Sequence, residues 1–145
     1  FPKFALISLT YILLKFNNYS MKKVIYTEKA PKAVGPYSQA IEHNNHLFIS
    51  GQIPIDPATG KIVEGGITEQ TEQVMKNIGA ILAEAGYTFE HVVKSTCLLS
   101  DMDNFAAMNA VYAKYYPTNP PARAAYGVVK LPLGAMIEIE TIAMK

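Results

Sequence analysis

The sequence predicts one α+β domain, in which a single mixed β-sheet carries two helices on one of its faces. Three observations lead to this fold class. Apolar residues recur every three or four positions over residues 74–82, which is the spacing of an amphipathic helix. Isoleucine and glutamate alternate over residues 137–140, as in a strand with one buried face. The expected elements follow one another as strand, hairpin, helix, strand, helix, strand and strand.

The first elements are expected to be a strand and a hairpin. Residues 24–26 are apolar and follow two lysines, which favours a short strand. Residues 37–42 and 47–50 are predicted to pair as a β-hairpin, because the asparagine-rich residues 43–46 between them suit a tight turn.

A loop and the first helix follow. Residues 51–60 are interpreted as a loop, because aspartate, proline and glycine punctuate them. The helix is predicted to begin with Thr68 as its N-cap, and Glu69 and Glu72 suit the positive end of the helix dipole. Gly86 is the expected C-terminal stop.

The second half of the chain predicts a strand, a helix and two strands. Residues 92–99 are mostly apolar and form the strand. Asp101 or Asp103 is the expected cap of the second helix, which ends at the prolines that follow it. Residues 122–129 and 136–144 complete the sheet.

Composition and charge favour a small-molecule partner. Half of the 145 residues are apolar and 17% are charged, so one core forms and apolar surface remains for a neighbouring subunit. The formal net charge is +1; residues 1–20 contribute two lysines and no acid, which leaves 11 basic and 12 acidic residues in 21–145. This balance lacks the basic stripe of a nucleic-acid-binding protein.

Residues 1–20 are expected to be an extension outside the folded domain, which is assigned to residues 21–145. Their apolar run is shorter than the ~20 residues needed to span a bilayer, and no small-residue cleavage site follows it. Met21 opens a stretch that resembles a natural start. We expect a cytoplasmic protein without membrane association; the alternative is an organelle-targeting leader, whose usual arginines are missing.

No sequence motif indicates a metal site or a phosphate loop. His43, His46 and His91 lack a third ligand at zinc spacing and are interpreted as surface residues. Cys97 is the only cysteine, and its apolar surroundings favour a buried small hydrophobe in a reducing compartment. A redox or nucleophilic role for Cys97 is the alternative.

Arg123 is the only arginine in the chain and lies among small apolar residues. This placement favours a planar guanidinium that binds a carboxylate through two parallel hydrogen bonds. The alternative is a salt bridge to Glu138 or Glu140 on a neighbouring strand. These glutamates share one side of their strand, so one of them is a candidate base toward water, and a solvated polar face is the alternative.

Five blocks of the sequence resemble the RidA family of enamine/imine deaminases, also called endoribonuclease L-PSP. They stand in the family's order and at its usual spacing, and the resemblance covers about residues 21–145. The blocks are Gly35-Pro36-Tyr37-Ser38-Gln39-Ala40, Ser50-Gly51-Gln52-Ile53-Pro54, Asn104-Phe105 with Asn109, Pro121-Ala122-Arg123, and Ile137-Glu138-Ile139-Glu140.

The resemblance implies a chorismate-mutase-like fold and a homotrimer with ligand sites in the clefts between subunits. It implies no metal and no organic cofactor. The implied activity is that of a 2-iminobutanoate/2-iminopropanoate deaminase, a hydrolase that converts 2-aminoacrylate, 2-aminocrotonate or their imine tautomers to 2-keto acids and ammonia. Pyridoxal-phosphate enzymes release these compounds from serine and threonine.

The same resemblance assigns roles to residues of this chain. It implies that Arg123 holds the substrate carboxylate and that Glu138 orients or activates the attacking water. Tyr37 is implied to line the pocket beside the imino group, and Gly51 to offer a backbone contact. Because a protonated imine is already electrophilic, such placement is sufficient without covalent catalysis.

Three further residues complete the implied substrate site. Ser50 and Asn109 lie close to the ligand in this interpretation. Ala125 departs from the family, which often has a small polar residue or cysteine at this position. Because the contact there is thought to come from the backbone, we expect activity to survive.

Two other functions stay open at this point. The family has also been labelled an endoribonuclease or translation inhibitor, which predicts a basic RNA-binding face and an acid–base pair beside a phosphate. The third possibility is a non-catalytic small-carboxylate-binding or chaperone-like module that uses the same cleft.

Overall fold

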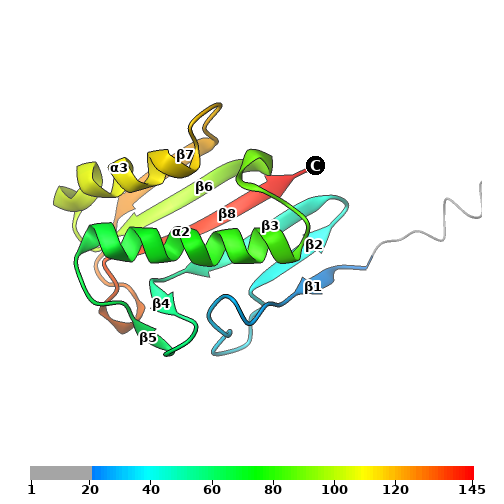
Figure 1. The fold of residues 1–145 in the computed structure, drawn as a ribbon, viewed down its shortest axis with the longest axis horizontal. Coiled ribbons are helices and arrows are strands. Elements are labelled where there is room, and N and C mark those ends of the chain that lie inside the picture. Colours follow the sequence, from blue (N-terminus) through cyan, green and yellow to red (C-terminus); the bar gives the residue numbers. More distant parts are fainter. Residues whose placement is uncertain (1–20) are drawn as a thin grey trace, which may run out of the picture.

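A six-stranded sheet forms the centre of the molecule, and two helices cover one of its faces (Figure 1). The structure is a computed structural model that describes residues 21–145; the predicted extension at residues 1–20 lies outside the described part. The strand order is β1-β2-β3-β8-β6-β7, in which β6 and β7 are parallel and the other neighbours antiparallel. The predicted α+β class with one mixed main sheet is therefore confirmed. The bounds are β1 Lys23–Ile25, β2 Ala40–His43, β3 His46–Gln52, β6 Val92–Leu99, β7 Ala122–Gly127 and β8 Ile137–Met144.

The longer helix, α2 (Ile67–Glu84), lies across the middle of the sheet, and α3 (Phe105–Tyr115) lies beside it (Figure 1). The predicted apolar stripe of α2 is fully buried, and burial of each large aliphatic side chain stabilises the fold by roughly 1.5–3 kcal/mol. The stripe packs on strands β3 and β8. The buried residues at this interface are Val74, Met75, Ile78, Ile81 and Leu82 of α2 and Leu47, Ile137 and Ile139 of the sheet.

The turn between β2 and β3 has the geometry that its two asparagines favour. Asn44 and Asn45 both have positive φ angles, of 49° and 61°. A type I′ hairpin turn has positive φ at both central residues, which matches the twist of the strands, and asparagine tolerates this conformation. The predicted hairpin is confirmed, although its first strand begins at Ala40.

The predicted N-cap of α2 was wrong by two residues. Gly66, not Thr68, occupies the cap, and its backbone N–H donates to the Glu69 carboxylate at 2.8 Å. Ile67 is buried, so the helix begins early enough to place this side chain in the core. The predicted stop is confirmed, because Gly86 has a φ of 77° directly after the C-cap.

Two other local predictions need correction. The predicted loop at residues 51–60 is interrupted by strand residues: β3 continues to Gln52, and β4 (Ile55–Asp56) pairs with β5 (Lys61–Ile62), which directly follows the predicted loop. Asp101 caps a 3-10 turn at Met102–Asn104 that leads into α3, and does not cap α3 itself. Its carboxylate accepts from the Asp103 N–H at 2.9 Å.

The face of the sheet opposite the helices carries an apolar row. Val24, Ile41, Phe48 and Ile142 are successive register partners across β1, β2, β3 and β8, and Val24 and Phe48 are exposed. Within residues 21–145, no helix is long and apolar enough to cross a membrane.

Candidate active site

A pocket of about 520 Å³ opens beside the end of β3. The segment before β2 forms one wall, the end of β3 forms another, and Glu138 of β8 and a turn at Pro132–Leu133 close the remainder. Four of the predicted site residues line it. These are Tyr37, Ser50, Gly51 and Glu138.

The backbone around the pocket is held by polar contacts. Ser50 donates through its hydroxyl to the Ser38 carbonyl at 2.7 Å, which joins β3 to the wall before β2. The Tyr37 hydroxyl accepts from the Val34 N–H at 3.3 Å. The buried side chain of Gln39 forms hydrogen bonds with the backbone of residues 27–31. Its amide accepts from the Thr27 N–H and donates to the carbonyls of Thr27, Ala30 and Pro31.

Gly51 leaves room for the Glu138 side chain. A Cβ atom at position 51 would collide with the Glu138 carboxylate, so any larger residue there displaces the acid. The strand register shifts between Ile49 and Gln52, which places this glycine at an irregularity of β3. The glycine therefore determines where the carboxylate lies.

Glu138 is a half-buried carboxyl with a raised pKa. Burial is the larger cause, and the neighbouring carboxylate of Glu140 adds to it. As predicted, both acids lie on one side of β8 while Ile137 and Ile139 face the core. A carboxylate whose pKa is raised toward neutral pH is a better base toward water than an exposed one.

The guanidinium of Arg123 lies on the other face of the sheet, against α3. It donates to the Asn109 side-chain oxygen at 2.8 Å and lies over the rings of Tyr112 and Phe105, at 4.7 and 5.5 Å from their centroids. Ala125 follows two positions later on the same side of β7, opposite Cys97 of β6. Asn109, Arg123 and Ala125 thus form a second cluster.

The register explains why Arg123 makes no salt bridge to the glutamates. Arg123 pairs with buried Ser95, whose side chain faces the helices. Glu138 and Glu140 pair with Leu98 and Thr96, which alternate with the buried positions and face the other way. Within residues 21–145, the single ion pair is Lys23 with Glu42, at 3.7 Å. The salt-bridge alternative for Arg123 is therefore wrong.

One chain thus contains the predicted site as two halves on opposite faces of the sheet. The pocket holds the acid, and the cluster on α3 and β7 holds the cation. The ring partners of Arg123 were not recognised from the sequence, although Phe105, Asn109 and Tyr112 stand at i, i+4 and i+7 on α3, a spacing that puts them on one helix face.

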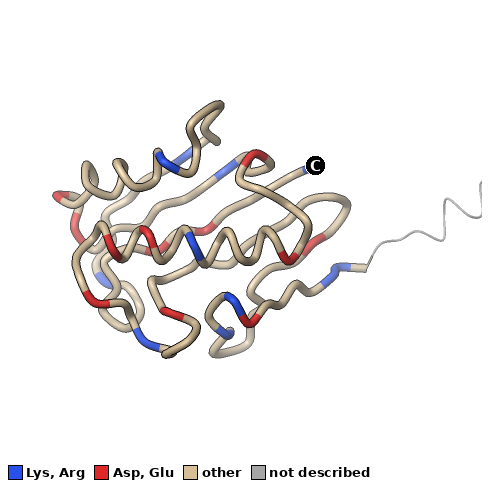
Figure 2. The backbone as a smooth tube through the Cα atoms, in the orientation of Figure 1, with Lys and Arg blue, Asp and Glu red and all other residues tan. Residues whose placement is uncertain are grey.

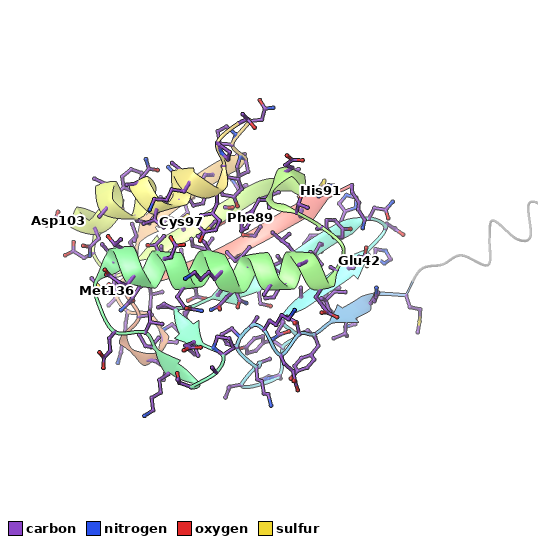
Figure 3. All side chains as sticks on the ribbon, viewed as in Figure 1. Glu42, Phe89, His91, Cys97, Asp103 and Met136 are labelled. Atoms are coloured by element: carbon purple, nitrogen blue, oxygen red, sulfur yellow. The ribbon has the colours of Figure 1, made fainter. Side chains whose placement is uncertain are left out.

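The cysteine and histidines take no part in either half. Cys97 is fully buried between the helices and the sheet (Figure 3), as predicted, and burial raises the pKa of its thiol to about 11 although Arg123 acts in the opposite direction. Such a thiol stays protonated and unreactive at neutral pH. Within the described part of the chain, no group of three His, Cys, Asp or Glu side chains could hold a metal ion.

Charged residues of both signs are spread over the helices, strands and loops (Figure 2). Lysines and acids are interspersed on the helices and the connecting loops, and no element carries a run of cations.

The model of the family described as Endoribonuclease L-PSP matches residues 27–145. The chain belongs to this family, which includes the RutC and RidA proteins. A RutC family protein of Pyrococcus horikoshii is 58% identical to this L-PSP family member over 125 residues, which are 86% of this chain and 99% of the relative. The human 2-iminobutanoate/2-iminopropanoate deaminase is 49% identical over 125 residues, 86% of this chain and 91% of the relative.

Other L-PSP family members extend the comparison. Reactive Intermediate Deaminase A, chloroplastic, of Arabidopsis thaliana is 49% identical over 142 residues, 98% of this chain and 73% of the relative. A Rid family protein from Yersinia pestis superposes with a TM-score of 0.84 at 49% identity, covering 86% of this chain and all of that one. E. coli TdcF with bound serine superposes with a TM-score of 0.82 at 35% identity, covering 85% of this chain and 98% of that one.

Proposed function

We propose that this protein is a hydrolase that deaminates 2-imino acids, and their enamine tautomers such as 2-aminoacrylate and 2-aminocrotonate, to 2-keto acids and ammonia. The observation that carries the proposal is that one chain holds both groups the reaction needs, a half-buried acid of raised pKa in a pocket and, on the opposite face of the sheet, a guanidinium held by Asn109 and two rings. The deaminase name of the human relative and the serine bound to TdcF support an amino-acid-like substrate.

The active form in this proposal is a homotrimer whose sites lie between subunits. Arg123 stands on β7, an edge strand, and faces away from the side of the sheet that carries Glu138. A neighbouring copy is therefore needed to bring a guanidinium to the pocket. The exposed apolar row on the open face of the sheet supports such an interface, because exposed apolar surface of this kind marks association sites.

The chemistry of the composite site follows from its two groups. Arg123 of one subunit holds the substrate carboxylate with its planar fork, while Glu138 of the next accepts a proton from water as the oxygen adds to the iminium carbon. The tetrahedral intermediate then receives that proton on nitrogen. As the carbon–nitrogen bond breaks, the hydroxyl gives its proton to the Glu138 carboxylate, the carbonyl forms, and ammonia leaves a keto acid. Ser50, Asn109, Tyr37 and the backbones of Gly51 and Ala125 surround the substrate.

The decisive experiment replaces the planar guanidinium of Arg123 with another group of the same positive charge. Arg123→Lys should lower deaminase activity by about 100-fold or more, because a lysine cannot make two parallel hydrogen bonds to a carboxylate. Keto-acid release is measured while a serine or threonine dehydratase supplies the imine. Lys76→Ala, which removes an exposed cation from α2, is the matched control and should keep full activity. An Arg123→Lys variant that is as active as the unchanged protein would refute the assignment.

The family description keeps the endoribonuclease as a second candidate. It predicts cleavage of RNA that depends on one of the two half-sites. RNA cleavage that persists in Arg123→Ala would indicate another site or a contaminant. Binding of small carboxylates without any keto-acid release would instead favour the non-catalytic binding or chaperone-like module.

Two further parts of the proposal concern chemistry and compartment. No cofactor is invoked, since an iminium carbon is electrophilic enough for water to add once it is positioned. The proposed compartment is the cytoplasm. The chloroplastic form named for the Arabidopsis relative supports the organelle alternative, and imaging of a carboxyl-terminal fluorescent fusion distinguishes the two.

A further inference from the structure

Four hydroxyl groups are buried together behind Arg123. Within residues 21–145 none of them has a hydrogen-bond partner, and every one of the four residues is less than one-tenth exposed. An unsatisfied buried hydroxyl costs about 1–3 kcal/mol, so four in one place call for a ligand that satisfies them. The four residues are Ser95, Tyr112, Tyr116 and Thr141.

The hydroxyls continue a polar row that starts at Arg123. Arg123 of β7, Ser95 of β6 and Thr141 of β8 are register partners across three adjacent strands, and the buried faces of Ser95 and Thr141 point toward the helices. Tyr112 of α3 and Tyr116 at its C-cap pack together there, with ring centroids 4.6 Å apart.

The hydroxyls are close to one another but are not joined directly. Burial raises the pKa of Tyr112 and of Tyr116, and weak hydrogen bonding from the Ser95 hydroxyl acts on both in the opposite direction. None of the four hydroxyl oxygens reaches full hydrogen-bond geometry with another group of residues 21–145. Polar groups that are near neighbours yet lack a direct hydrogen bond are commonly bridged by a water molecule. Buried waters occupy such polar sites and make two to four hydrogen bonds each.

We propose that these four hydroxyls bind one buried water molecule between α3 and the sheet, and that this water fixes Tyr112 against the guanidinium of Arg123. Water offers two donors and two acceptors, and hydroxyls can serve either role, so the cluster satisfies the molecule fully. The Tyr112 ring lies 4.7 Å from the Arg123 guanidinium. Tyr112 is thus a positioning residue, which acts on the substrate only through Arg123.

A crystal structure of the unchanged protein at high resolution tests the water site directly. We expect an electron-density peak within about 2.6–3.2 Å of at least three of the four hydroxyl oxygens. Direct hydrogen bonds among the hydroxyls with no peak between them would overturn the proposal.

Melting temperatures provide an independent test. If water occupies the site, Ser95→Ala or Thr141→Val removes one of its partners, and the Tm should fall by about 2–4 °C. If the hydroxyls are truly unsatisfied, deleting one removes a buried orphan group and the Tm should rise. An unchanged or raised Tm in both variants therefore contradicts the bound water.

The positioning role rests on the proposed deaminase function and has its own readout. Tyr112→Phe keeps the ring but removes the hydroxyl that binds the proposed water. It should raise KM about three- to tenfold with little change in kcat, because the substrate carboxylate is bound in both the ground state and the transition state. Tyr115→Phe is the matched control, since it removes a hydroxyl of the same helix that donates to Glu72 outside this cluster, and its KM should stay near that of the unchanged protein.

The outcomes separate the two proposals. An unchanged KM in Tyr112→Phe, measured beside an active unchanged protein, would refute the positioning role. If the unchanged protein releases no keto acid, the deaminase proposal fails instead, while the density and melting measurements still decide the water site.

Discussion

Glu138 owes its chemical character to two neighbours, Gly51 and Glu140. The glycine gives the carboxylate its space beside β3, and the second acid adds negative charge to the half-buried position. In the proposed mechanism Glu138 is the base and acts in its ionised form, so activity should be present above the pKa of Glu138 and be lost as pH falls through it. Because the pKa of Glu138 is raised, the loss of activity on the acidic side of the pH profile should occur at a higher pH than it would for an ordinary carboxyl.

The contribution of Glu140 can be isolated by neutralising it. Glu140→Gln removes a like charge, so the pKa of Glu138 should fall and the acidic limb of the profile of kcat/KM against pH should move to lower pH. Burial is the larger cause of the raised pKa and persists in this variant, so the acidic limb should stay at a higher pH than that of a free carboxyl. Glu84→Gln, on the exposed face of α2, should leave the limb in place. A limb that fails to move in Glu140→Gln would show that another group titrates.

At the level of single residues, sequence reasoning identified the charged groups of the candidate site but missed the aromatic side chains that contact Arg123. Arg123 could be recognised because it is the only arginine, and Glu138 because isoleucines flank it in an alternating strand. Phe105 and Tyr112 were not recognised as partners of Arg123, since an aromatic stripe at helical spacing is the usual signature of packing. Only the three-dimensional position of the guanidinium gives these rings their second role.

Among the secondary elements, α2 contributes to the pocket through a buried amide. Asn77 is fully buried on the sheet side of α2, and its side-chain nitrogen donates to the carbonyls of Ile53 and Ile55 at 3.2 and 3.0 Å. Its oxygen accepts from Gln73 at 2.8 Å. The helix thereby holds the segment that lines the pocket between β3 and β4.

Removing this amide should weaken both the fold and the pocket wall. Asn77→Leu keeps the volume but leaves the Ile55 carbonyl without its partner, so the free energy of unfolding should fall by about 1–3 kcal/mol. Urea denaturation measures the change. Gln73→Ala, which removes only the outer partner of Asn77, is the control and should have a smaller effect. Equal stability of Asn77→Leu and the unchanged protein would mean that the two carbonyls find other donors.

The elements themselves were largely predictable, and the exceptions have local causes. Strong periodicity located α2, and the turn formers located the β2–β3 hairpin. The short pair of β4 and β5 was missed because two-residue strands are too brief for a periodic signal, and the α2 cap because Glu69 reaches back to the backbone of Gly66. Register across β6, β7 and β8 could not be predicted either, and it is the register that puts Arg123 and Glu138 on opposite faces.

For the whole molecule, the separation of the two half-sites makes assembly a condition of the deaminase activity that we propose. The chorismate-mutase-like comparison and the number of three subunits stay predictions from the family resemblance. A ring of identical subunits joined head to tail brings the arginine face of each copy to the pocket of the next. In the proposed trimer, each site takes Arg123 from one chain and Glu138 from its neighbour.

Mixing two inactive variants tests this arrangement. Arg123→Ala and Glu138→Gln each disable every site of a homotrimer, yet in a randomly mixed trimer about one site in four takes an intact arginine from one chain and an intact glutamate from the next. Refolding an equal mixture should therefore restore about a quarter of the activity of the unchanged protein, whereas either variant refolded alone stays inactive. Sedimentation confirms that trimers re-form. If both groups acted from the same chain, no mixture would regain activity, and the sheet geometry described here would have to open for catalysis.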